Sequence, residues 1–138
     1  MDRQQVLRDV KDSFGIVPGF INAIPDPHIE AMWTSMKQLQ LQPGQIPPKY
    51  QQLMMLAVST YAKCKYCTDF HTEAARAVGA SESEIAETAL LVGHTAMFSN
   101  WLGGTQYDFA DFQREVRLAC KMLSGNGGRA KPSPSARA

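Results

Sequence analysis

Residues 63–71, KCKYCTDFH, bring together two cysteines and a histidine in a chain that has only three of each. Side chains three, four and seven positions apart share one face of a helix. Cys64, Cys67 and His71 have these spacings. If the segment is helical, all three side chains project from one stripe.

This cluster has the components of a redox dithiol. Cys64 is expected in the first turn of its helix, where unpaired N–H groups and the helix dipole favour a thiolate. Cysteine pairs of this spacing often have depressed pKa values. His71 can take up and return a proton near pH 7, as a thiol nucleophile requires. Lys63 and Lys65 add positive charge beside the pair.

Two other interpretations of the cluster remain open. A structural zinc site needs four ligands, and only Cys120, His94 or His28 could complete a set of three. The cysteines could also be small core residues, which accounts for one cysteine better than for two in register with a histidine. The redox dithiol is the leading hypothesis, with no metal and no cofactor.

The bulk composition is that of a globular protein. The chain of 138 residues fits one domain, with 44% hydrophobic and 20% charged residues. The charged N-terminus is unlike a signal peptide, and no apolar run is long enough to span a membrane. Three cysteines do not make a secreted disulfide framework, so we expect a cytoplasmic protein.

The positive charge is concentrated at the C-terminus. Arg129, Lys131 and Arg137 lie in SGNGGRAKPSPSARA, which has no acidic residue. Without these three cations the formal net charge of +1 becomes mildly negative, which argues against nucleic acid as a partner. The stretch is rich in Gly, Ser and Pro, so we predict a helical domain over residues 1–123 and a disordered basic tail over 124–138.

Helix signals dominate the domain, and strand signals are nearly absent. The sequence therefore predicts an all-α fold of five to six helices, with GIVPGF (residues 15–20) as a turn between the first two. Cys120 is expected to be a buried apolar residue of the last helix. The predicted helices are 2–13, a segment from 26 to the Pro-Gly at 43–44, one opening at 47–48, the cysteine segment to 79, 81–102 and 107–123.

The stretch PPKYQQLMMLAVSTYAKCKYCTDFHTEAARAVGASESEIAE resembles the AhpD-like alkylhydroperoxidases, the branch of the carboxymuconolactone decarboxylase family that has a C-x-x-C pair. The resemblance runs over roughly residues 15–95 and includes G-x-V-P-x-F, the apolar helix, C-x-x-C-x-x-x-H and a later Ser-x-x-Glu. Members of this branch are all-helical, form trimers or hexamers, and reduce hydroperoxides.

The resemblance implies a role for each residue of the cluster. Cys67 matches the peroxidatic thiol, and Cys64 matches the resolving thiol that donates a proton and closes a Cys64–Cys67 disulfide. His71 matches the histidine of the proton relay. The implied partners are a hydroperoxide substrate, a dithiol or thioredoxin-like reductant and further copies of the chain.

One position departs from the family pattern. Twelve residues before the first cysteine, where the relay has a glutamate, this chain has Gln52. A glutamine can orient a histidine but cannot shuttle a proton at neutral pH. The leading hypothesis is a thiol-dependent peroxidase. The alternatives are a non-enzymatic redox- or metal-responsive thiol module, and a family scaffold whose catalysis is weakened at Gln52.

Overall fold

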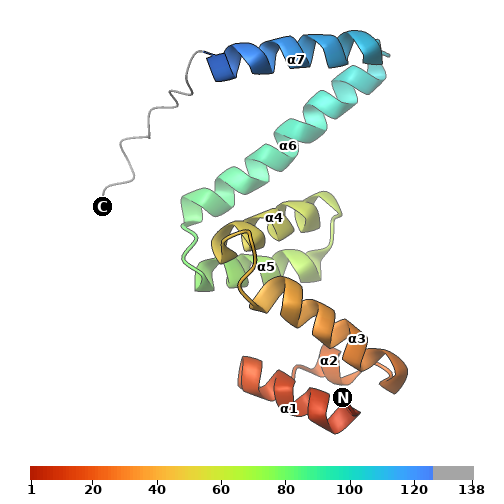
Figure 1. Cartoon of the computed structure of the whole chain (residues 1–138), viewed down its shortest axis with the longest axis vertical. Helices are drawn as coiled ribbons and strands as arrows, with labels where there is room; N and C mark the ends of the chain where they lie inside the picture. The colour runs from red at the N-terminus through yellow and green to blue at the C-terminus, as the bar shows by residue number, and fades with distance from the viewer. Residues whose placement is uncertain (126–138) are drawn as a thin grey trace. The chain divides into compact units, whose positions relative to one another are not determined.

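The computed structural model describes residues 1–125, and all of its regular structure is helical, as predicted. Figure 1 shows the helices in chain order. Their bounds are α1 Arg3–Phe14, α2 Gly19–Asn22, α3 Asp26–Met36, the π-helical η1 Lys37–Leu41, α4 Pro48–Tyr61, α5 Lys65–Ala77, α6 Glu82–Gly104 and α7 Phe109–Gly125.

The described chain divides into two compact units. The first, Met1–Gly93, contains α1 to α5, η1 and the first half of α6. The second begins at His94 and contains the rest of α6 and α7. The domain boundary predicted at residue 123 lies inside α7, which continues to Gly125. Residues 126–138 of the predicted tail lie outside the described residues.

The N-terminal helices enclose a small apolar core. Asp2 begins α1 with a capping box, in which its side chain accepts from the Gln5 N–H and Gln5 reaches back to the Asp2 N–H. The indole of Trp33 donates to Asp9 at 2.7 Å, and Lys37 donates to the same carboxylate at 2.6 Å. These bonds fix α3 and the start of η1 on α1. The core consists of Val6, Val10, Ile21, Ile29 and Trp33.

Helices α4 and α5 pack together more extensively than any other pair of elements in the described chain, and Figure 1 shows them side by side. Pro47 and Pro48 begin α4 as predicted. The chain reverses after Tyr61, where Lys63 takes a left-handed conformation (φ 57°), and α5 begins at Lys65. The buried side of α4 carries Gln52, Leu56 and Ser59, while α5 buries His71 and Ala75.

Two short elements differ from the prediction. The expected turn GIVPGF runs into the four-residue helix α2, because the N–H groups of Ile21 and Asn22 both bond to the Pro18 carbonyl. The described residues therefore form seven α-helices where five or six were predicted. The segment before Pro43 widens into a π-turn, closed by the bond from the Gln42 N–H to the Lys37 carbonyl at 3.0 Å.

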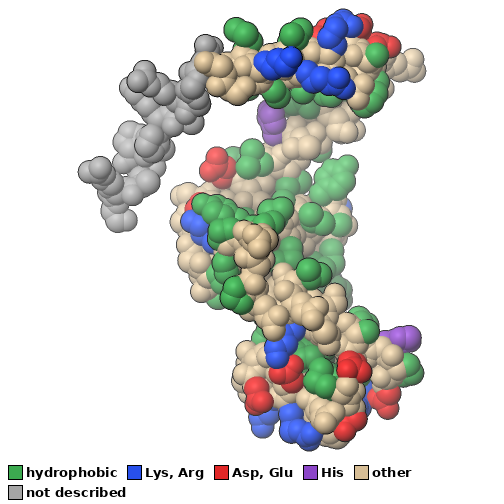
Figure 2. Space-filling view, in the orientation of Figure 1, with side chains coloured by type: hydrophobic (Ala, Val, Ile, Leu, Met, Phe, Trp, Pro, Cys, Tyr) green, Lys and Arg blue, Asp and Glu red, His purple; other side chains and the backbone are tan. Residues whose placement is uncertain are grey.

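Helix α6 begins with the predicted capping box. Ser81 and Glu84 exchange bonds of 2.8 and 3.2 Å, and the helix ends at the Gly103-Gly104 pair. The composition of α6 is apolar, yet Thr88 is the one buried residue of this helix, all of which lies within residues 1–125. No helix among residues 1–125 is long and apolar enough to cross a membrane. Figure 2 shows hydrophobic side chains exposed over α4 and α5 and charged ones gathered over α1.

Candidate active site

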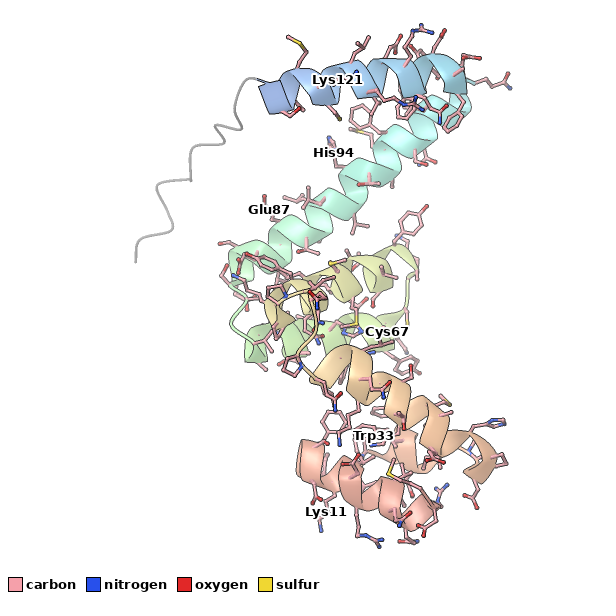
Figure 3. The ribbon with its side chains drawn as sticks, viewed as in Figure 1. Lys11, Trp33, Cys67, Glu87, His94 and Lys121 are labelled. Atoms are coloured by element: carbon pink, nitrogen blue, oxygen red, sulfur yellow. The ribbon has the colours of Figure 1, made fainter. Side chains whose placement is uncertain are left out.

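The two cysteines lie at the start of α5, where the chain leaves its turn. Cys64 is the N-cap rather than a first-turn residue, and its sulfur accepts a hydrogen bond from the Cys67 N–H at 3.4 Å. Cys67 lies one turn along the helix, as Figure 3 shows, and its side chain is exposed. Cys64 is half-buried, and both thiols are free.

The two sulfurs have unequal acidity. The Cys67 side chain and the Cys67 backbone N–H both donate to the Cys64 sulfur, and they lower the pKa of Cys64. The same side-chain bond raises the pKa of Cys67, because ionising Cys67 would remove the proton it donates to Cys64. Of the two thiols, Cys64 is therefore the one that ionises more readily.

His71 lies four residues past Cys67 on the buried side of α5. Its Nδ1 is 2.9 Å from Oε1 of Gln52 on α4, and the two side chains are only 7% and 4% exposed. The ring also meets Phe70 edge-on, with the centroids 5.1 Å apart. Burial lowers the pKa of His71, so the imidazole is neutral at physiological pH.

A groove of about 910 Å³ joins Cys67 and His71. Its walls are mostly apolar, which suits an organic ligand with a polar group near the thiol. Two side chains of the predicted stripe, Cys67 and His71, line it, whereas Cys64 is connected to it through its hydrogen bond with Cys67. The other lining residues are Phe20, Met36, Gln40, Lys65, Tyr66, Asp69, Phe70 and Glu73.

Sequence reasoning missed Phe20 and Gln40. Phe20 belongs to α2, which the pattern predicted as a turn, and Gln40 belongs to the π-helical η1. The Gln40 carbonyl oxygen is the one buried side-chain polar atom of the described chain that has no hydrogen-bond partner. No local signal for either residue exists, because each reaches the groove through tertiary packing.

The remaining cysteine and histidines belong to other helices. Cys120 was expected to be buried, but it is exposed, since α7 buries none of its residues in the described structure. His94 is exposed on α6, with its ring 5.0 Å from that of Phe98. Within residues 1–125, no group of three or more His, Cys, Asp or Glu side chains could hold a metal ion. The zinc interpretation gains no support from these positions.

The sequence pattern of the carboxymuconolactone decarboxylase family matches residues 27–102, more than half of the chain. The chain belongs to the carboxymuconolactone decarboxylase family. A crystal structure of an alkylhydroperoxidase AhpD core from Rhodospirillum rubrum is similar, with a TM-score of 0.66 and 26% sequence identity over 76% of this chain and 80% of that one. No curated protein matches the sequence.

This family membership confirms the resemblance and the AhpD-like helical fold inferred from the cysteine segment. The chain is thus a family member that carries a C-x-x-C pair at the start of α5. The family match ends at residue 102, just before the end of α6. Helix α7 therefore lies beyond the matched segment.

The unequal acidity of the thiols predicts which one is alkylated first. In the reduced protein carrying Cys120→Ser, iodoacetamide near neutral pH should label Cys64 ahead of Cys67, because the thiolate is the reactive form. In Cys67→Ser, the backbone N–H and the new hydroxyl still donate to Cys64, so its pKa should stay below the ordinary value. Mass spectrometry of the labelled peptides measures the order, and preferential labelling of Cys67 would contradict it.

The buried imidazole predicts a loss of stability on mild acidification. The pKa of His71 is lower in the folded protein than the ordinary value near 6.5, so the unfolded chain binds a proton first as the pH falls. The contribution of the neutral His71 ring to the free energy of unfolding is fully present above about pH 6.5 and declines as the pH falls below that value. Thermal unfolding between pH 5 and 7.5 should show this slope, and His71→Gln should flatten it. His28→Gln, at an exposed position, is the matched control.

Proposed function

We propose that the protein is a thiol-dependent peroxidase that reduces hydroperoxides through a Cys64–Cys67 dithiol–disulfide cycle. The observation that carries this proposal is the groove in which the Cys67 thiol and a buried neutral imidazole share apolar walls. The Cys64 sulfur, which accepts a hydrogen bond from the Cys67 N–H at 3.4 Å, supplies the second sulfur. A nucleophile, a base and a second sulfur are the groups that such a cycle requires.

The cycle begins at Cys67. His71 takes the Cys67 proton, and the resulting thiolate attacks the terminal oxygen of the hydroperoxide. The S–O bond forms as the O–O bond breaks, which leaves a sulfenic acid on Cys67. The departing alkoxide takes the proton back from His71 and leaves as an alcohol. The two electrons that reduce the peroxide come from the Cys67 sulfur.

Cys64 then closes the disulfide. Its thiolate attacks the Cys67 sulfur, the S–S bond forms, and hydroxide leaves and takes a proton from solvent to become water. An external dithiol, such as a thioredoxin-like reductant, supplies two electrons and restores both thiols. The exposure of Cys67 supports access for such a reductant. A cycle that depends on this supply suits the reducing cytoplasm.

A cysteine replacement tests the proposed cycle. Cys67→Ser should abolish the reduction of cumene hydroperoxide by a dithiol, because no sulfur remains to attack the peroxide. Cys64→Ser should stop turnover after one sulfenic acid per site, which a dimedone adduct on Cys67 would reveal. Cys120→Ser is the matched control and should retain full activity. Full activity in both site variants would refute the proposal.

A redox sensor is the second candidate, supported by the same exposed dithiol and by the absence of a relay carboxylate at Gln52. A sensor forms the disulfide once and does not turn over. One equivalent of hydroperoxide would then oxidise the cysteine pair, but added dithiol would not lead to further consumption of hydroperoxide. That result would favour a redox sensor over a peroxidase.

We also propose that the protein works as a homo-oligomer, a trimer or hexamer by analogy with the family. The support lies in α6, which is apolar in composition but exposes large side chains in the single chain, Leu90, Leu91, Met97, Phe98 and Trp101 among them. A helix that is apolar all round normally lies inside a larger structure.

Light scattering should therefore give a mass of three or six chains for the native protein. Leu90→Glu places a charge on the exposed apolar surface of α6 and should lower that mass while the helical circular dichroism persists. Glu87→Gln, an exposed polar position on the same helix, is the control. A native protein that stays monomeric at micromolar concentration would contradict the assembly.

A further inference from the structure

The contact between Gln52 and His71 is direct and dry. Nδ1 of His71 and Oε1 of Gln52 are 2.9 Å apart, the length of a single hydrogen bond, so no water molecule fits between them. Both side chains are buried, one on each of the two helices that pack most extensively in the described chain. The imidazole is thus held at one nitrogen by an uncharged group.

The oxygen of a carboxamide accepts hydrogen bonds and cannot donate them. With Oε1 facing the ring, Nδ1 of His71 must carry the hydrogen. A neutral imidazole has only one N–H, so the lone pair then resides on Nε2. Burial keeps the ring neutral and leaves that lone pair free to accept a proton.

We propose that Gln52 is a positioning residue that holds His71 as the neutral Nδ1–H tautomer and so makes Nε2 the base for the Cys67 thiol. The base role rests on the function proposed above, whereas the tautomer does not. In this proposal the amide at position 52 is not a defective relay. It performs a different task, because it selects one ring nitrogen and carries no proton.

The charged groups around His71 are consistent with this role. Those that share its groove are the carboxylates of Asp69 and Glu73, the ammonium of Lys65, and the ionisable groups of Cys67 and Tyr66, all on α5. Elements α2, α3 and η1 contribute Phe20, Met36 and Gln40, which are uncharged.

Helix α4 carries ionisable side chains only at its ends, at Lys49, Tyr50 and Tyr61. No carboxylate occurs between Glu30 and Asp69 in the sequence. The neighbour of Nδ1 is the amide of Gln52, which does not ionise and stays neutral at every pH at which the protein is folded.

A neutral neighbour has a functional consequence. A carboxylate at position 52 would form an ion pair with the imidazolium and raise the pKa of His71. At any given pH a larger fraction of the rings would then already hold a proton and could not accept one from Cys67. With glutamine at this position, His71 remains a competent base to lower pH.

Nitrogen NMR of the native reduced protein tests the tautomer directly. In ¹⁵N-histidine-labelled protein, the couplings from the ring carbon hydrogens distinguish a protonated Nδ1 from a protonated Nε2. The rings of His28 and His94 give reference signals in the same spectrum, and His71→Gln assigns the third. We expect an Nδ1–H tautomer at His71. An Nε2–H tautomer, or rapid averaging of the two, would overturn the proposal.

Two variants test the role of the amide. Gln52→Leu keeps the approximate volume and removes the acceptor, so the His71 tautomers should mix and kcat should fall by roughly 10-fold or more, as for a base held in the wrong tautomer. Gln52→Glu should raise the pKa of His71 and move the acid limb of the pH–rate profile to higher pH. Gln51→Leu, the neighbouring position on α4, is the control for replacing a glutamine.

The outcomes separate this inference from the proposed function. Spectra that change in Gln52→Leu as expected support the tautomer assignment whether or not peroxide is consumed, because they do not depend on turnover. If no variant and no native sample consumes hydroperoxide, the proposed function alone fails. If Gln52→Glu is faster than the native protein at neutral pH, the native relay is incomplete and the positioning role of Gln52 is wrong.

Discussion

The packing of α4 against α5 sets the chemical character of the site, and the Gln52–His71 hydrogen bond lies within that packing. Because the imidazole is buried, its charged form is disfavoured. Because the glutamine beside it is neutral, nothing on α4 restores that charged form. The two effects act in the same direction, and together they favour the neutral imidazole.

The thiol end of α5 has the opposite electrostatic character. Cys64 caps the helix, where the N–H groups and the dipole stabilise negative charge, and Lys63 and Lys65 flank it. The exposed N-terminus therefore favours an anion, while the buried face one to two turns further along favours a neutral ring. Cys67 lies between them, bonded through its side chain to Cys64 and sharing a groove with His71. One helix thus places Cys67 beside a sulfur that accepts its hydrogen bond and in a groove that it shares with a neutral imidazole.

Features with a local cause could be predicted from the sequence. Proline at 47–48, the Ser81–Glu84 capping box and the glycine pair at 103–104 act within a turn of their own position, and the structure has each of them. The proximity of position 52 to His71 came from the family resemblance. The groove walls at Phe20 and Gln40 could not be predicted, because they depend on a short helix and a π-turn whose bonds compete closely with those of an ordinary turn.

The exposure of Cys120 could not be predicted either, because it also depends on tertiary packing. An amphipathic pattern tells which face of a helix is apolar but does not tell what covers that face. Helix α7 has such a pattern and buries nothing in the described single chain, so its cysteine is exposed. The residues that line the groove, together with Gln52, belong to α2, α3, η1, α4 and α5, within the first unit. Their hydrogen bonds and burial are therefore already present in a single chain, and they do not require the apolar surfaces of α6 and α7 to be covered.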